Sequence, residues 1–360
     1  MNAGARSKLW LLAAIAIAGA VIWFAREPFR QWQAGRLVEA ARTLRKNGDL
    51  RGAYLSCQEA LLKNPLSAQA CEIAAEVAEI EHSPAAILWR QRLAERRRGS
   101  TGSLIDLAAA ATRLGESFIA EQALAQVPVS ERNSASFRQA AASLAISLGQ
   151  YAAAEEQFEQ ALKTDPKNES LQLNLATVRI ALRRPGQLDS ARAVLDALRA
   201  SPQSHTAALR ALIGDARAAG DAARAMQLAR ELKQDAQATL GDQLLWLEEL
   251  QHAGSADLQA ELSRLQTGAM ERPEIAYALM TWMNANGLAA ESIRWCESLP
   301  AKIRTQLPVP LAEAEARTAL ADWKQLREVV RDADWGDLEF LRFAIHARVL
   351  CETDGQKRRT

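Results

Sequence analysis

Apolar residues recur along most of this chain at the three- and four-residue spacing of helices that bury one face. The pattern is clearest between Ser136 and Asn168, where two apolar-periodic runs flank a Gly-Gln-Tyr turn. In the second run Phe158 follows Ala154 by four residues, so both side chains lie on one helical face. Small side chains let two helix backbones approach closely, and the aromatic ring fills the seam between them. This stretch therefore predicts a packed helix–turn–helix pair.

The same stretch resembles the tetratricopeptide repeat, a helix–turn–helix unit of about 34 residues. The residues that carry the resemblance are Gly149, Tyr151, Ala154, Phe158, Ala161, Asp165 and Pro166. The resemblance implies a solenoid in which the first helices of successive units line a concave groove. In that family the groove accepts an extended peptide or a helix of a partner protein.

Turn residues between paired apolar runs recur along the chain at steps of 32 to 37 residues. This spacing predicts an all-α fold, an α-solenoid of about nine helical hairpins over residues 31–335. The turn residues are Gly48, Ser83, Gly115, Gly149, Gly186, Gly220, Gly254, Gly287 and Asp322. Hairpins two, seven and nine are predicted from the spacing more than from the motif. In the second hairpin Ser83-Pro84 replaces the turn glycine, and in the fifth an insertion at 183–186 lengthens the turn.

A last apolar-periodic run predicts a capping helix over residues 336–353, followed by a polar tail over residues 354–360. A repeat array needs a terminal cap whose outer face is polar. This run carries polar side chains, but apolar residues cover much of the remainder. Two interpretations stay open, a plain cap or an open edge that serves as a docking surface.

The amino-terminal region combines a basic tail, residues 1–8, with 17 uncharged and mostly apolar residues at 9–25. That length is at the lower limit for a helix that crosses the hydrocarbon core, so the pattern predicts a transmembrane signal-anchor. The alternatives are a cleaved signal peptide, with a small-residue site at Ala18-Gly19-Ala20, and a buried helix of the repeat body. Because a short basic tail favours the cytoplasmic side, we expect a single-pass protein with an extracytoplasmic body. A cytoplasmic body is the alternative.

Composition narrows the function classes. Hydrophobic residues make up 49% of the chain and aromatic residues 5%, which favours close-packed helices rich in Ala and Leu. The 44 basic and 43 acidic residues balance, so nothing indicates a nucleic-acid partner. The four cysteines and four histidines are dispersed, and no phosphate-binding, dinucleotide or hydrolase motif occurs. We therefore expect no enzyme activity, no cofactor and no metal.

Polar residues on the predicted first helices are the candidates for a partner-binding groove. In the frame of the resemblance, the groove residues are Arg42, Arg45, Glu72, Glu76, Glu79, Arg210, Arg217, Tyr277 and Asn284. One interpretation is a groove with segregated charge, acidic at hairpin two and basic at hairpins one and six. The other is that these are solvated helix faces on which Arg42 and Arg45 pair with the neighbouring Glu row. Exposed ion pairs of that kind contribute only about 0–1 kcal/mol each.

Cysteines and tryptophans are interpreted mainly as core residues. Cys57 and Cys71 come from neighbouring predicted helices and are read as two small buried hydrophobes, with a disulfide as the alternative in an extracytoplasmic body. Trp246, Trp282 and Trp295 lie among Leu, Met and Ala, which favours core packing over an aromatic ligand site.

Taken with the anchor, the repeats resemble membrane-anchored tetratricopeptide repeat proteins of bacterial type. The expected role is a scaffold or adaptor that binds a protein partner in the groove or at the carboxyl-terminal edge. Its context would be envelope assembly, secretion or polysaccharide export. The alternatives are a cytoplasm-facing anchored regulator of envelope assembly and an accessory subunit of an enzyme complex.

Overall fold

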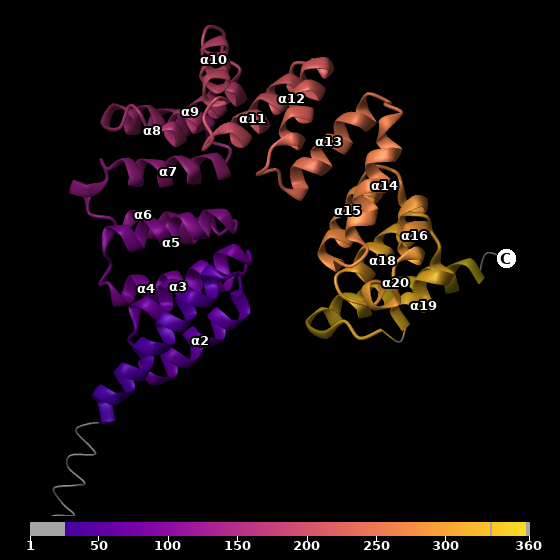
Figure 1. The fold of residues 1–360 in the computed structure, drawn as a ribbon, viewed down its shortest axis with the longest axis horizontal. Coiled ribbons are helices and arrows are strands. Elements are labelled where there is room, and N and C mark those ends of the chain that lie inside the picture. Colours follow the sequence, from indigo (N-terminus) through magenta and orange to yellow (C-terminus); the bar gives the residue numbers. More distant parts are fainter. Residues whose placement is uncertain (1–25, 332, 358–360) are drawn as a thin grey trace, which may run out of the picture. The chain divides into compact units, whose positions relative to one another are not determined.

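A computed structural model describes residues 26–331 and 333–357 of the chain (Figure 1). The predicted signal-anchor, residues 9–25, lies outside the described residues. Within the described part, no helix combines the length and apolar character that crossing a membrane requires.

The described residues form nine consecutive helical hairpins and contain no strand. A helix over residues 26–46 pairs with α2 (Leu50–Lys63) in the first hairpin. The next four hairpins are α3 (Ala68–Ile80) with α4 (Ala85–Arg96), α5 (Thr101–Arg113) with α6 (Ser117–Ala125), α7 (Ala135–Ser147) with α8 (Tyr151–Thr164), and α9 (Glu169–Leu182) with α10 (Leu188–Leu198). The last four are α11 (His205–Ala218) with α12 (Ala222–Gln234), α13 (Leu240–His252) with α14 (Asp257–Ala269), α15 (Pro273–Ala285) with α16 (Ala289–Ser298), and α18 (Val309–Ala319) with α19 (Trp323–Arg331).

Three short elements interrupt or end this series. The 3-10 helix η1 (Val129–Glu131) lies between α6 and α7, and the short helix α17 (Ala301–Arg304) lies between α16 and α18. After α19, η2 (Gly336–Leu338) leads into the terminal helix α20 (Glu339–Lys357). The chain divides into two compact units between Leu198 and Arg199. Within each unit, helices that are neighbours in sequence pack side by side (Figure 1).

The core is built mainly from small side chains, as the sequence pattern predicts. In the fourth hairpin Phe158 is fully buried in a cluster with Ala142, Ala154 and Ala161. In the first hairpin the fully buried Cys57 packs in the corresponding small-residue seam. Trp246 and Trp295 are buried, and Trp282 packs against the cluster around Trp295. For the described residues, the prediction of an all-helical fold of about nine hairpins is confirmed.

One left-handed residue closes the first helix of each hairpin. In the fourth hairpin Gly149 has φ 71°, and the N–H of the next residue, Gln150, donates to the Ala145 carbonyl at 2.8 Å. This six-residue closure is the Schellman motif, which satisfies carbonyls at the helix end. In three hairpins the left-handed residue that closes the first helix comes before the predicted turn residue. It is His82 instead of Ser83 in hairpin two, Arg183 instead of Gly186 in hairpin five, and Ala321 instead of Asp322 in hairpin nine.

The terminal helix differs from its predicted range. The sequence pattern places it over residues 336–353, whereas α20 begins at Glu339 and continues to Lys357. Its inner face packs on α19 around the buried Trp335 and Val349. Its outer face leaves Phe340, Phe343 and Leu350 exposed.

Candidate functional site

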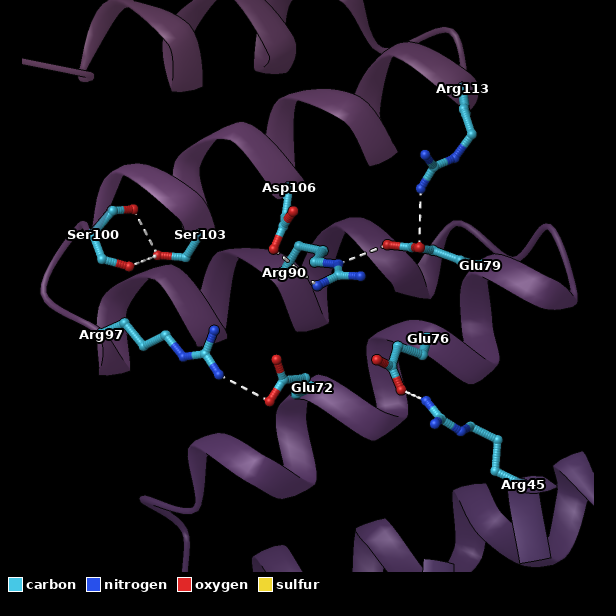
Figure 2. Close-up of polar contacts among 10 residues, drawn as sticks. All are labelled: Arg45, Glu72, Glu76, Glu79, Arg90, Arg97, Ser100, Ser103, Asp106 and Arg113. Atoms are coloured by element: carbon cyan, nitrogen blue, oxygen red, sulfur yellow. Dashed lines mark hydrogen bonds and ion pairs between the residues drawn. The ribbon is translucent and has the colours of Figure 1, made fainter. Parts of the chain in front are cut away.

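The predicted acidic row lies on α3 and is engaged by arginines from three other helices (Figure 2). Glu76 pairs with Arg45 of the first helix. Glu72 accepts a 2.8 Å hydrogen bond from the Nη2 atom of Arg97, which immediately follows α4. Glu79 pairs with Arg90 and Arg113. The row is therefore an internal network and not a free acidic surface.

Glu79 joins two neighbouring hairpins. Its Oε1 atom accepts from Arg90 Nε of α4 at 2.6 Å, and its Oε2 atom lies 2.9 Å from Arg113 Nη2 of α5. Arg90 is itself buried and also lies 3.5 Å from Asp106 of α5. Buried guanidinium groups need such partners, because a buried charge without them is strongly destabilising. Arg42, by contrast, pairs with Glu39 of its own helix at 2.6 Å and not with the row.

The two basic candidates on α11 face carboxylates of α13. Arg210 makes a bidentate pair with the buried Asp242, with both N···O distances at 2.7 Å. Burial would raise the pKa of Asp242, but hydrogen bonds from Arg210 and Thr239 outweigh it and hold this pKa below its ordinary value. Arg217 pairs with Glu249 and, at 2.8 Å, with Glu248. These arginines connect successive first helices of the second unit.

The apolar candidates border a hollow near the carboxyl end of the array. This hollow, called the terminal hollow below, has a volume of about 500 Å³. It is lined by residues of α15, α18 and α20: Tyr277, Thr281, Leu311, Ala314, Glu315, Thr318, Ala319, Leu341 and Ile345. The structure thus brings the predicted Tyr277 into a pocket of ordinary ligand-binding size.

Asn284 lies further along α15 and holds two helices together. Its amide nitrogen donates to the Ala312 carbonyl at 2.9 Å and to Glu315 at 3.2 Å. Its amide oxygen and the hydroxyl oxygen of Thr281 are buried and have no hydrogen-bond partner among the described residues. The sequence prediction missed the α20 wall of the hollow. The signal for it was the apolar spacing of Leu341 and Ile345.

A second cavity, of about 720 Å³, lies on the other face of α18. Arg317, which is 6% exposed, lines it and pairs with Glu313 at 2.7 Å, Asp322 at 3.0 Å and Glu297 at 3.2 Å. The adjacent Cys296 is buried, and burial together with the Glu313 carboxylate raises its pKa to about 12. This thiol therefore stays protonated at neutral pH, and nucleophilic chemistry needs the thiolate.

The remaining cysteines behave as packing groups or as a surface thiol. Cys57 and Cys71 are both unbridged and buried in the structure, as the core interpretation predicts. Burial raises the pKa of Cys57 to about 11. Cys351 on α20 is free and exposed. In the described part of the chain, no three His, Cys, Asp or Glu side chains are grouped as metal ligands.

Comparisons with known proteins agree with this architecture. Residues 145–215 match the sequence model of the tetratricopeptide repeat family. The fold is similar to that of a tetratricopeptide repeat protein from Parabacteroides merdae, with TM-score 0.54 and 17% identity, over 68% of this chain and 94% of that chain. No curated protein sequence matches the chain.

Two pilus-related structures also show weaker likeness. Pseudomonas aeruginosa pilF is 19% identical with TM-score 0.45, over 62% of this chain and 99% of that chain. PilW, a widely conserved type IV pilus biogenesis factor, is 17% identical with TM-score 0.37, over 68% of this chain and 98% of that chain.

Proposed function

We propose that this tetratricopeptide repeat protein is a non-enzymatic scaffold of a bacterial-type envelope, tethered to the membrane by residues 9–25. Proteins built from these repeats mediate protein–protein interactions. Support for the tether is the uninterrupted apolar run at 9–25 behind a basic tail. In this proposal the repeat array lies outside the cytoplasm and holds a partner polypeptide in a complex for envelope assembly, secretion or polysaccharide export.

The terminal hollow is the proposed binding site. The observation that supports it is its largely apolar lining, which is not engaged in ion pairs between helices. The charged groove candidates on α3 and α11 are already paired with neighbouring helices, so a ligand would have to break those pairs. The hollow is instead lined largely by apolar side chains. Thr281, one of the lining residues, holds a buried hydroxyl oxygen that has no hydrogen-bond partner among the described residues. An unsatisfied buried polar group costs about 1–3 kcal/mol, so an N–H group of a bound segment that reaches this oxygen would be stabilising.

Site-specific crosslinking tests this site in cells. A photoreactive residue at Ala319, which is exposed and lines the hollow, should capture a partner protein. The same residue at Leu320 is the matched control, because Leu320 is exposed next to it but does not line the hollow. We also expect Ala319→Trp to weaken partner binding by about tenfold, a loss of about 1.4 kcal/mol. Equal capture at both positions would contradict the proposal.

Thiol labelling tests the side of the membrane on which the array lies. Cys351 is exposed, whereas the other three cysteines are buried, so a membrane-impermeant maleimide reports on one position of the folded protein. Labelling in intact spheroplasts supports an extracytoplasmic array. Labelling only after lysis places the array in the cytoplasm and favours the regulator alternative.

A further inference from the structure

We infer that one edge of the first two hairpins is a docking surface for an anionic lipid bilayer. This inference rests on the proposed membrane tether. The edge, called the proximal edge below, joins exposed apolar side chains to a group of cations: Phe29, Trp32, Leu62 and Leu66 with Arg26, Arg30, Lys63, Arg96, Arg97 and Arg98.

Contacts between helices bring these residues to the same edge. Arg30 Nη2 donates to the Leu62 carbonyl at 3.2 Å, which places the start of the first helix beside the end of α2. Leu66 lies in the connection that follows α2. Arg97, just after α4, pairs with Glu72 in the second turn of α3, so the Arg96–Arg98 run lies near the start of α3.

The large apolar side chains of the proximal edge are highly exposed to solvent. Leu62 is 75% exposed, Leu66 65%, and Phe29 and Trp32 56% each. Phe29 and Trp32 stack with ring centroids 5.8 Å apart, and the Arg36 guanidinium lies over Trp32 at 5.3 Å. Large apolar side chains gathered at one place mark interaction sites, whereas scattered ones need no explanation.

The charge of the edge selects an anionic occupant. Arg26, Arg96 and Arg98 are exposed and have no ion pair among the described residues. The six cations of the edge face three nearby acids: Glu27, which is 3.6 Å from Arg30, Glu72, which pairs with Arg97, and the exposed Glu95. Exposed aromatic rings beside free arginines are typical of segments that lie in the lipid headgroup layer.

The position of the edge along the chain points to the bilayer and not to a protein partner. Residues 26–46 are helical, and residue 26 directly follows the apolar run of the sequence at 9–25. Phe29 and Trp32 are four and seven residues beyond residue 25, or about 6 and 10 Å along a helix. The headgroup layer beyond the hydrocarbon core is about 5–10 Å deep, so both rings fall at its level.

Lipid-depth quenching of a fluorophore tests the docking in the full chain. An environment-sensitive probe is attached at Leu62→Cys in a Cys351→Ser background, and the protein is reconstituted into phosphatidylcholine vesicles with or without phosphatidylglycerol. The matched control is Ile80→Cys, because Ile80 is also large and exposed but ends α3, at the opposite edge of the hairpins. With phosphatidylglycerol present, spin-labelled lipid should quench the Leu62 probe and leave the Ile80 probe unquenched.

Removing cations tests the electrostatic part. The double variant Arg96→Gln/Arg98→Gln should lower the docked-to-free ratio by about thirtyfold, at about 1 kcal/mol for each cation near an anionic surface. Arg272→Gln/Arg327→Gln, which neutralises two exposed arginines of the second unit, should leave the ratio unchanged.

Failure of the proposed tether and failure of the docking surface give different results in these experiments. A chain that alkaline carbonate extracts from the vesicles disproves the proposed tether. A chain that stays embedded while its Leu62 probe is as unquenched as the Ile80 probe disproves the docking surface. Equal quenching with and without phosphatidylglycerol disproves the choice of an anionic occupant.

Discussion

At the scale of single residues, the left-handed turn position explains why the repeat spacing survives poor sequence matches. Gly149 has open space around it, so only its backbone conformation calls for glycine. His82, Arg183 and Ala321 adopt the same conformation with a Cβ atom, at a cost of about 1–2 kcal/mol each. The nine left-handed positions lie 33 or 34 residues apart, except for 37 residues between Arg183 and Gly220. The sequence predicted this period from the glycines. At the positions without glycine, the hydrogen bonds that close the helix, and not the residue type, determine which residue is left-handed.

Replacing Ala321 by glycine should therefore stabilise the ninth hairpin. Ala321 is exposed and has φ 55°, so Ala321→Gly relieves strain without loss of packing. We expect a gain of about 0.5–1 kcal/mol in the free energy of unfolding, measured by urea denaturation. Ala319→Gly, two residues earlier and still within α18, should lower it by about 0.5–1 kcal/mol. Shifts of the same sign in both variants would argue against the strain.

At the scale of helices, the sequence does not predict which polar side chains of different helices pair with one another. The spacing of Glu72, Glu76 and Glu79 predicts one helical face, and the structure agrees. The arginines that cover this face come from α4, α5 and the first helix, and only stacking decides which of them reach it. The pairing of Arg45 was foreseen as an alternative, but the roles of Arg90 and Arg97 were not.

The terminal helix is held to α19 by a buried arginine. Arg342 Nη1 donates to the Val330 carbonyl at 2.6 Å and to the Arg331 carbonyl at 3.2 Å, so it caps the last turn of α19. Arg342→Met keeps the aliphatic stem but leaves those carbonyls unpaired, at an expected cost of about 1–3 kcal/mol. Hydrogen exchange in α19 and α20 measures the loss. Arg327→Met, at an exposed position of α19, should change exchange by less than about 0.5 kcal/mol.

At the scale of the whole molecule, the fold class follows from helical periodicity, but the division into two units and the terminal hollow do not. The predicted turn residues Gly186 and Gly220 keep the ordinary step of 34 residues across Leu198, so the sequence ruler does not mark the break between the two compact units. In the structure the step from Arg183 to Gly220 is longer, at 37 residues. Of the residues that line the terminal hollow, the resemblance to the tetratricopeptide repeat predicts Tyr277 as a groove residue. Leu341 and Ile345 form the opposite wall only because α20 folds back beside α18.

Nearest-neighbour packing predicts that core damage stays local. Phe158 is fully buried in the first unit, and Phe158→Ala should lower the opening free energy of α7, α8 and α9 by about 3–5 kcal/mol. Amide exchange resolved by peptide is the measurement, and protection of α13 to α20 should not change. Met283→Ala, at a fully buried site of the second unit, is the matched control: it should lower protection in the second unit and leave α7, α8 and α9 unchanged. Loss of protection throughout the chain after either change would show one cooperative unit instead.

A series of hairpins that pack only on their neighbours also has a mechanical consequence. Within each compact unit, a load applied between the first and last hairpins passes through the hairpin interfaces in turn, so no core shares it in parallel. The weakest interface then yields first and releases one hairpin of chain, while the other hairpins keep their structure. If the chain links a membrane to a partner, it would act as an extensible connector that lengthens in steps of about 34 residues and shortens again when the pull ends.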